Sequence, residues 1–153
     1  MKNAAESDYR NRRQRANEDA RQPQREITVT PGTVGAVMNA PAVSVAPELS
    51  IREFVDRVLS KNRLTKFPVA HEGRLHGVLS LERLRELPQE VWAQTTIREV
   101  MEPISDDLFI SMRASIEHAQ RKLNVNRLGF LAVIDQEGFL VGSVNAVDME
   151  QAV

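Results

Sequence analysis

The sequence predicts an α/β fold of the mixed α+β kind, made of two tandem β-α-β-β-α repeats that pack as a pseudo-twofold pair. The first observation is that residues 66–87 and 130–152 each show a β-hairpin followed by a short helix. In each stretch a short apolar run meets a polar turn that ends in glycine, and a second run leads to another glycine. These glycines are Gly73 and Gly77 in the first stretch and Gly138 and Gly142 in the second.

A second observation is the residue type that follows each hairpin. Ser80 and Asn145 stand where the two helices are expected to begin. Both side chains can accept a hydrogen bond from an N–H group that the first helical turn leaves unpaired. Each hairpin is therefore expected to lead directly into a helix.

The third observation is the regular distance between matching motifs. The segment Thr33–Met38 opens the first half and Thr96–Met101 opens the second, with their methionines 63 residues apart. The triplet Asn-Arg-Leu precedes both hairpins at an offset of 64, and the glycines are 65 apart. Neither half can bury its apolar face alone, so we expect residues 33–152 to form one intramolecular dimer. The expected segments are a charged tail or helix at 1–31, a first repeat at 32–87, a linker at 88–95 and a second repeat at 96–153.

The clearest helix is expected to begin after Ser50. Five apolar residues recur at i, i+3, i+4, i+7 and i+8, which places them on one helical face. They are Ile51, Phe54, Val55, Val58 and Leu59. Ser50 and Glu53 form a capping-box pattern, and Leu49 would pack on Phe54 as a hydrophobic staple.

Shorter elements are expected around this helix. A matching helix is predicted to begin at Ser115 and to use Ile116, Ala119 and Leu123. One helical turn is expected at residues 33–38, and a short strand at residues 42–46. Each repeat would then run strand, helix, strand, strand, helix.

Composition excludes several classes of protein. The 153 residues include no cysteine, which rules out a disulfide framework and a thiolate metal site. No apolar run approaches the roughly 20 residues that span a bilayer, and the N-terminus lacks the apolar core of a signal peptide. The 42% hydrophobic residues suffice for a packed core, and the 27% charged residues favour a soluble protein. We therefore expect a cytoplasmic protein.

The first 26 residues are unusual because they contain seven basic and five acidic residues and hardly any large apolar ones. Four arginines lie between Arg10 and Arg15, next to Tyr9. Such a run can contact phosphates of nucleic acid or lipid headgroups. The alternative, a solvated and partly helical tail, is favoured because charge runs are usually solvated. Nucleic acid is therefore not an expected partner.

These features together resemble a CBS-domain pair, also called a Bateman module. The resemblance is carried by the two β-α-β-β-α units and by Val-Met-x-(x)-Pro at residues 37–41 and 100–103. It is also carried by the Gly-hydrophobic-x-Ser/Asn-x-x-Asp ending of the hairpins, and it covers most of the chain. A narrower resemblance, in residues 2–10 and 87–92, is to the cytosolic CBS region of site-2-protease-type zinc metalloproteases.

The resemblance implies two clefts between the repeats, which in CBS pairs commonly hold adenosine-containing ligands. The first cleft would be formed by Thr33, Met38, Leu64, Thr65, Ser143, Asn145 and Asp148. The Asp148 carboxylate would accept hydrogen bonds from the ribose hydroxyls, and Asn145 with the helix N-terminus would suit a phosphate. The edges of Met38 and Leu64 would sandwich the adenine. Alternatively, Asp148 is an acidic residue that stabilises the start of a helix.

The second implied cleft departs from the family pattern. It would be formed by Thr96, Met101, Leu128, Gly129, Ser80 and Arg83. Arg83 stands where the ribose-binding aspartate is expected, and a guanidinium group only donates hydrogen bonds. This cleft is therefore degenerate and empty, or Arg83 binds a phosphate of a ligand that lies differently. Asn145 in place of Ser or Thr, and Ala132 in place of a hairpin proline, are further departures.

Catalysis is not expected, and no metal site is predicted. His71 and His76 are five residues apart, not the four that place two ligands on one helical face, and His118 is the only other histidine. Ser80 has no histidine base at a recognisable spacing. The sequence also lacks a glycine-rich phosphate loop.

The predicted function is a non-catalytic regulatory module that senses AMP, ATP or S-adenosylmethionine between its repeats. No cofactor is required, and the module is expected to form a homodimer through its helices. The alternative is a ligand-free dimerisation or docking module for a regulated enzyme. That module would be the cytosolic tail of a site-2-protease-type membrane metalloprotease, at the cytosolic face of a membrane.

Overall fold

The computed structural model describes residues 29–126 and 128–151, apart from the side chains of Asp148, Glu150 and Gln151. The predicted charged tail and Arg127 of the second Asn-Arg-Leu triplet lie outside the described residues. The α-helices are α2 (Val34–Val37), α3 (Ile51–Arg57), α4 (Leu81–Arg85), α5 (Ile97–Val100), α6 (Ile116–Asn126) and α7 (Ala146–Gln151), and the 3₁₀ helices are η1 (Leu59–Lys61) and η2 (Gln89–Val91). The strands are β1 (Lys66–His71), β2 (Arg74–Ser80), β3 (Glu102–Pro103), β4 (Phe109–Ser111), β5 (Phe130–Ile134) and β6 (Leu140–Asn145).

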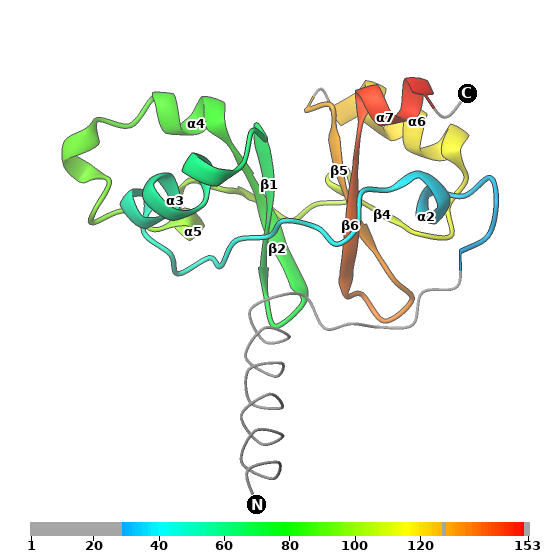
Figure 1. Ribbon diagram of the computed structural model, residues 1–153, viewed down its shortest axis with the longest axis horizontal. Helices are drawn as coiled ribbons and strands as arrows, with labels where there is room; N and C mark the ends of the chain where they lie inside the picture. The colour runs from blue at the N-terminus through cyan, green and yellow to red at the C-terminus, as the bar shows by residue number, and fades with distance from the viewer. Residues whose placement is uncertain (1–28, 127, 152–153) are drawn as a thin grey trace, which may run out of the picture.

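The strands form two three-stranded sheets, in the orders β1-β2-β3 and β4-β5-β6, which lie side by side with helices around them (Figure 1). The two predicted hairpins are present as the antiparallel pairs β1–β2 and β5–β6. Glu72 and Gly73 have φ angles of 51° and 81°, the left-handed conformation that a tight hairpin turn of this kind requires. The mixed α/β class predicted from the sequence is confirmed.

Helix α3 begins at the predicted position. The Oγ atom of Ser50 accepts a hydrogen bond from the backbone N–H of Glu53 at 3.1 Å. Phe54 is completely buried and meets Phe67 of β1 edge-to-face, with ring centroids 5.0 Å apart. Such an aromatic pair adds about 0.5–1.5 kcal/mol to the stability gained from burial alone. Leu49 packs against the same core cluster, as a staple residue would.

Helix α6 also follows its prediction. Ser115 precedes it, and the Ser115 Oγ atom accepts a hydrogen bond from the backbone N–H of His118 at 3.1 Å. Ala119 and Leu123 are the buried residues of this helix. The second repeat therefore shows the predicted order of elements, from β4 through α6, β5 and β6 to α7.

The strand predicted at residues 42–46 is wrong in its extent. It is reduced to a single parallel bridge, in which Val45 N donates to Pro68 O at 3.0 Å and Ala70 N donates to Val45 O at 2.9 Å. Pro41 and Pro47 flank the segment, and proline has no N–H group to extend the ladder. The corresponding β4 of the second repeat pairs with β5 over three residues.

The two opening segments are exchanged between the repeats. Figure 1 shows α2, from the start of the chain, beside the sheet of the second repeat, and α5 beside α3 of the first repeat. Val34 of α2 is fully buried in a core cluster formed by the second repeat, and Ile97 of α5 is fully buried in the cluster of the first. Each repeat therefore completes its core with a helix from the other.

Backbone hydrogen bonds fix this exchange at matching positions. The first N–H groups of α2, those of Val34 and Gly35, donate to carbonyl oxygens of the second repeat at 2.9 and 2.8 Å. Ile97 N and Arg98 N of α5 donate to carbonyl oxygens of the first repeat, both at 2.9 Å. The acceptors are Ala114 and Met112 for α2, and Leu49 and Pro47 for α5. Four N–H groups that a helix start leaves unpaired are satisfied in this way.

Two strand glycines allow the chain that follows each exchanged helix to cross the opposite sheet. Gly77 of β2 pairs with Pro103 of β3, and a Cβ atom on Gly77 would collide with the carbonyl oxygen of Glu102. A Cβ atom on Gly142 of β6 would lie 2.7 Å from the carbonyl oxygen of Asn39 and 2.7 Å from the Sδ atom of Met38. These contacts are closer than real Cβ atoms make, so glycine is required at both positions.

A third core cluster joins the two sheets. Its buried members are Ala42, Ala70, Leu75, Val78, Leu108, Phe130, Ala132 and Leu140. At the hairpin tips, Leu140 N donates to Gly73 O at 2.8 Å, and the Arg74 guanidinium lies 4.1 Å from the centroid of the Phe139 ring. Among the described residues, no helix has the length and apolar character needed to cross a membrane.

Replacing Gly77 by alanine tests whether β3 must pass this close to the backbone of β2. Because the new methyl group would strike backbone rather than a movable side chain, Gly77→Ala should destabilise the protein by about 1–3 kcal/mol or more. His76→Ala, a neighbouring substitution on the same strand, should stay within about 0.5 kcal/mol of the parent protein. Urea denaturation measures both, and equal effects of the two substitutions would contradict the crossing.

Candidate ligand-binding site

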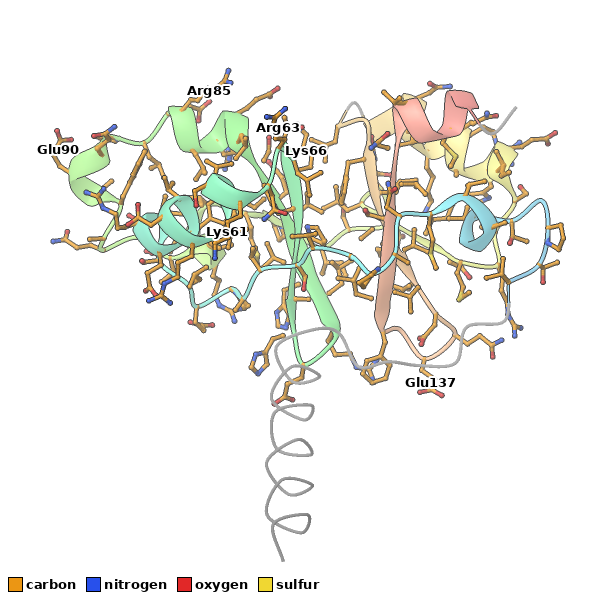
Figure 2. All side chains as sticks on the ribbon, in the orientation of Figure 1. Lys61, Arg63, Lys66, Arg85, Glu90 and Glu137 are labelled. Atoms are coloured by element: carbon orange, nitrogen blue, oxygen red, sulfur yellow. The ribbon has the colours of Figure 1, made fainter. Side chains whose placement is uncertain are left out.

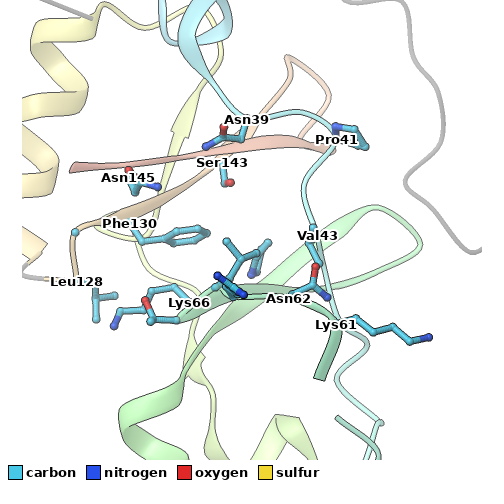
Figure 3. A pocket seen from close by; sticks show the side chains of 15 residues that line it. Asn39, Pro41, Val43, Lys61, Asn62, Lys66, Leu128, Phe130, Ser143 and Asn145 are labelled. Atoms are coloured by element: carbon cyan, nitrogen blue, oxygen red, sulfur yellow. The ribbon is translucent and has the colours of Figure 1, made fainter. Parts of the chain in front are cut away.

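A cavity of about 470 Å³ lies between the two repeats, where the loop before β1 faces β6 and the start of β5 (Figure 3). Sites for small molecules generally have volumes of roughly 300–1,000 Å³. The lining residues are Asn39, Pro41, Val43, Lys61, Asn62, Arg63, Leu64, Thr65, Lys66, Pro68, Leu128, Gly129, Phe130, Ser143 and Asn145.

One wall of the cavity is the segment that links η1 to β1. The side-chain nitrogen of Asn62 donates to the carbonyl oxygen of Val58 at 2.9 Å, which closes the end of the α3–η1 region. The carbonyl oxygen of Thr65 accepts a hydrogen bond from Leu81 N, the first residue of α4, at 3.0 Å. Both ends of this wall are therefore held by the rest of the first repeat.

The facing wall is the matching segment of the second repeat. Asn126 Oδ1 accepts a hydrogen bond from Leu128 N at 3.0 Å, and Asn126 Nδ2 donates to Phe130 O at 3.1 Å. Gly129 has φ +66° and accepts a hydrogen bond from Ala146 N, the first residue of α7, at 3.0 Å. Residues 61–66 and 128–130 thus lie on opposite sides of one cavity.

The cavity combines three kinds of surface. The Phe130 ring extends between Ser143 and Asn145 on one side and Asn62 and Lys66 on the other (Figure 3). Val43, Leu64, Leu128 and two prolines add further apolar surface, while Lys61, Arg63 and Lys66 are basic. Such a cavity suits a molecule with a flat or apolar part and a negatively charged part.

Four of the seven residues predicted for the first cleft line this cavity, namely Leu64, Thr65, Ser143 and Asn145. Asp148 lies on α7, but its side chain is outside the described residues. Thr33 and Met38 are not among the lining residues. The Thr33 hydroxyl donates to Thr30 O at 2.5 Å, and Met38 packs against the core of the second repeat.

The residues predicted for the second cleft are divided among several places. Leu128 and Gly129 line the same cavity as Leu64 and Thr65. Ser80 is buried and caps α4 as predicted, since its hydroxyl oxygen accepts a hydrogen bond from Glu82 N at 3.3 Å. Thr96 caps α5, with its N–H donating to Glu99 Oε2 at 2.7 Å.

Arg83 and Met101 complete the second predicted set. Arg83 Nε lies 4.0 Å from Glu102 Oε1, and both side chains are about half exposed. Met101 packs against the core of the first repeat and against Gly77. Arg83 therefore faces an acidic side chain of β3.

Sequence reasoning missed the remaining lining residues, among them Asn39, Lys61, Lys66 and Phe130. The cluster of basic residues was a signal in the sequence, because Lys61 and Lys66 flank the triplet that contains Arg63. Phe130 gave no such signal, since an aromatic residue at the start of a strand is most simply explained as core.

The histidines form no recognisable metal centre. The rings of His71 and His76 lie 6.4 Å apart at the β1–β2 hairpin, and the nearest carboxylate is that of Glu72, 3.7 Å from His71 Nε2. Within residues 29–126 and 128–151, no group of three or more His, Cys, Asp or Glu residues is arranged to hold a metal ion.

Comparison with known proteins agrees with this architecture. The family model described as "CBS domain" matches residues 34–90, from α2 to η2. The CBS domain of a bacterial CNNM/CorC family Mg²⁺ transporter, solved in complex with ATP, has a TM-score of 0.69 and 18% identity, and the match covers 78% of this chain and 85% of that one. A search of curated protein sequences found no match.

Two further solved structures share the fold. CBSX2, a CBS-pair protein of Arabidopsis thaliana, solved in complex with AMP, has a TM-score of 0.65 and 24% identity over 78% of this chain and 94% of that one. The cytosolic domain of the Mg²⁺ channel MgtE, in complex with ATP, has a TM-score of 0.69 and 26% identity over 82% of this chain and 50% of that one. The fold of this protein is that of a CBS-domain pair.

Proposed function

We propose that this protein is a non-catalytic regulatory module that binds an adenosine-containing nucleotide between its two repeats. The observation that carries the proposal is the cavity between the Asn-Arg-Leu segments, which combines apolar, polar and basic walls. Structures of the same fold in complex with ATP and AMP support it. The ligand is proposed to be regulatory, with no cofactor required.

Within the cavity, each part of the nucleotide has a matching surface. The apolar residues Val43, Leu64 and Phe130 offer surface for the adenine ring, and the basic side chains offer partners for phosphate. Ser143 and Asn145, at the end of β6, provide hydrogen-bonding groups between these regions. Asp148, on the helix that follows, is proposed to accept hydrogen bonds from the ribose hydroxyls.

Thermal melting with AMP, ATP and S-adenosylmethionine tests this proposal. A ligand that binds only the folded protein, at a hundred times its Kd, should add about 2.7 kcal/mol of stability and raise Tm by several degrees. The shift with an adenine nucleotide should disappear in Asp148→Ala. It should persist in Asp56→Ala, which removes an exposed carboxylate from α3.

Two results would contradict the proposal. If none of the three compounds shifts Tm at millimolar concentration, the nucleotide function fails. A Tm that instead rises with protein concentration would favour the alternative, a ligand-free assembly module. If the shift survives in Asp148→Ala, the ribose role of Asp148 is wrong.

We also propose that the module forms a homodimer through its helices. α6 packs against α7, and each helix exposes a valine, Val125 at 70% and Val147 at 60% of its surface. Burying such side chains against a second copy would remove apolar surface from water.

Paired substitutions test the homodimer. Val125→Glu with Val147→Glu should convert a dimer into a monomer in sedimentation analysis. Ile104→Glu, which changes an exposed apolar side chain away from α6 and α7, should leave the dimer intact. A monomeric parent protein, or a dimer that survives the double substitution, would contradict dimerisation through these helices.

The proposed link to a membrane metalloprotease rests on the sequence resemblance alone. The comparisons with CNNM/CorC, CBSX2 and MgtE offer it no support. We also propose a cytoplasmic location and a regulated enzyme or transporter as partner, which the shared fold of a transporter CBS domain and of the cytosolic domain of MgtE supports.

A further inference from the structure

The charged residues that line the cavity in the described part of the chain are all basic. Lys61, Arg63 and Lys66 line it, and none of the fifteen lining residues is acidic. The chain as a whole has a net charge of −1, so the positive charge is concentrated here and does not reflect the composition. Figure 2 shows all three on the first repeat, with Arg63 and Lys66 close together near the start of β1 and Lys61 apart from them.

These three cations also make no ion pair with any residue in the described ranges. Arg57, Arg83 and Arg98, by contrast, each lie within 4.0 Å of a glutamate oxygen. Lys66 is half-buried at the start of β1, whereas Lys61 and Arg63 are exposed. The cavity therefore carries positive charge that the surrounding described side chains do not neutralise.

Two of the three cations belong to one repeat only, whereas Arg63 is part of the repeated Asn-Arg-Leu triplet. At an offset of 64, the residues that correspond to Lys61 and Lys66 are Val125 and Phe130. Arg83, predicted for the second cleft, instead lies 4.0 Å from Glu102. The two repeats thus share a backbone pattern but differ in their electrostatics.

We propose that the cavity selects a nucleotide with a di- or triphosphate chain that is not complexed with Mg²⁺, so that Mg²⁺ opposes binding. This inference rests on the proposed function of the same cavity and specifies its ligand. Lys66, Arg63 and Lys61 bind the phosphate chain, and their charges replace those of the metal ion. A longer phosphate chain carries more negative charge and gains more from the three cations.

Charge and ligand chemistry both disfavour the Mg²⁺ complex. Mg²⁺ neutralises part of the phosphate charge, and it usually keeps several waters and binds protein through one or two carboxylates. The described lining provides no carboxylate. S-adenosylmethionine, whose sulfonium is cationic and which has no phosphate, is disfavoured for the same reason. The module consequently responds to the balance between free and Mg²⁺-bound nucleotide.

Isothermal titration calorimetry of the whole chain tests this inference. The titrants are ATP with EDTA, ATP with excess MgCl₂ at matched ionic strength, AMP with EDTA, and inorganic tripolyphosphate with EDTA. ATP with EDTA should bind about tenfold or more tightly than either ATP with MgCl₂ or AMP. Tripolyphosphate should bind more weakly than ATP, because it lacks the nucleoside.

Charge-neutralising variants locate the effect. Lys66→Gln should weaken the binding of metal-free ATP about three- to tenfold and should reduce the penalty caused by Mg²⁺. Arg85→Gln removes a cation from the exposed surface of α4, outside the cavity, and should change neither value (Figure 2). Both side chains are replaced by an amide, so the two variants change the net charge equally.

These experiments distinguish a failure of the proposed selectivity against Mg²⁺ from a failure of nucleotide binding itself. Equal or tighter binding of the Mg²⁺ complex, or equal effects of Lys66→Gln and Arg85→Gln, would overturn the inference and leave nucleotide binding intact. No binding of any adenine nucleotide would overturn both. Tripolyphosphate binding as tight as that of ATP, with the same Mg²⁺ dependence, would support the charge argument but overturn the adenosine ligand.

Discussion

The close crossing of each opening segment over a glycine of the opposite sheet is the constraint on which the structure depends. Gly77 and Gly142 leave room for backbone where any other residue would place a Cβ atom. The crossing chains carry α2 and α5 into the cores of the opposite repeats, where Val34 and Ile97 are fully buried. Neither repeat has a complete core without the other, so the cavity between them exists only when both are folded.

The cavity follows from this arrangement. Because the repeats are joined by the exchange and by a shared cluster around Phe130, the two Asn-Arg-Leu segments are brought face to face. Their backbones are held alike, with Thr65 O and Gly129 O each accepting from the first N–H of the helix that follows the hairpin. Their described side chains differ, since Lys66 corresponds to Phe130, and this difference adds positive charge to one wall and apolar surface to the other.

Local signals allowed much of the fold to be predicted from the sequence. The cap at Ser50, the hairpin turns and the helix after Ser115 depend on residues close in the chain, and each was found where expected. The exchange of α2 and α5 was not predictable in this way, because a four-residue helix carries no signal about which sheet it packs against. Leu128 and Gly129 were assigned to a separate cleft for the same reason, although they line the cavity that contains Leu64 and Thr65. The contribution of Lys66 depends on what lies opposite it, which only the folded chain defines.

We propose one nucleotide site in this protein, at the basic cavity, and none beside Arg83. The most direct measurement is amide chemical-shift mapping by NMR during titration with metal-free ATP. We expect the largest shifts at residues 61–66, 128–130 and 143–145, with little change at residues 80–83. Shifts centred on residues 80–83 and 102, or none in residues 61–66, would contradict the account.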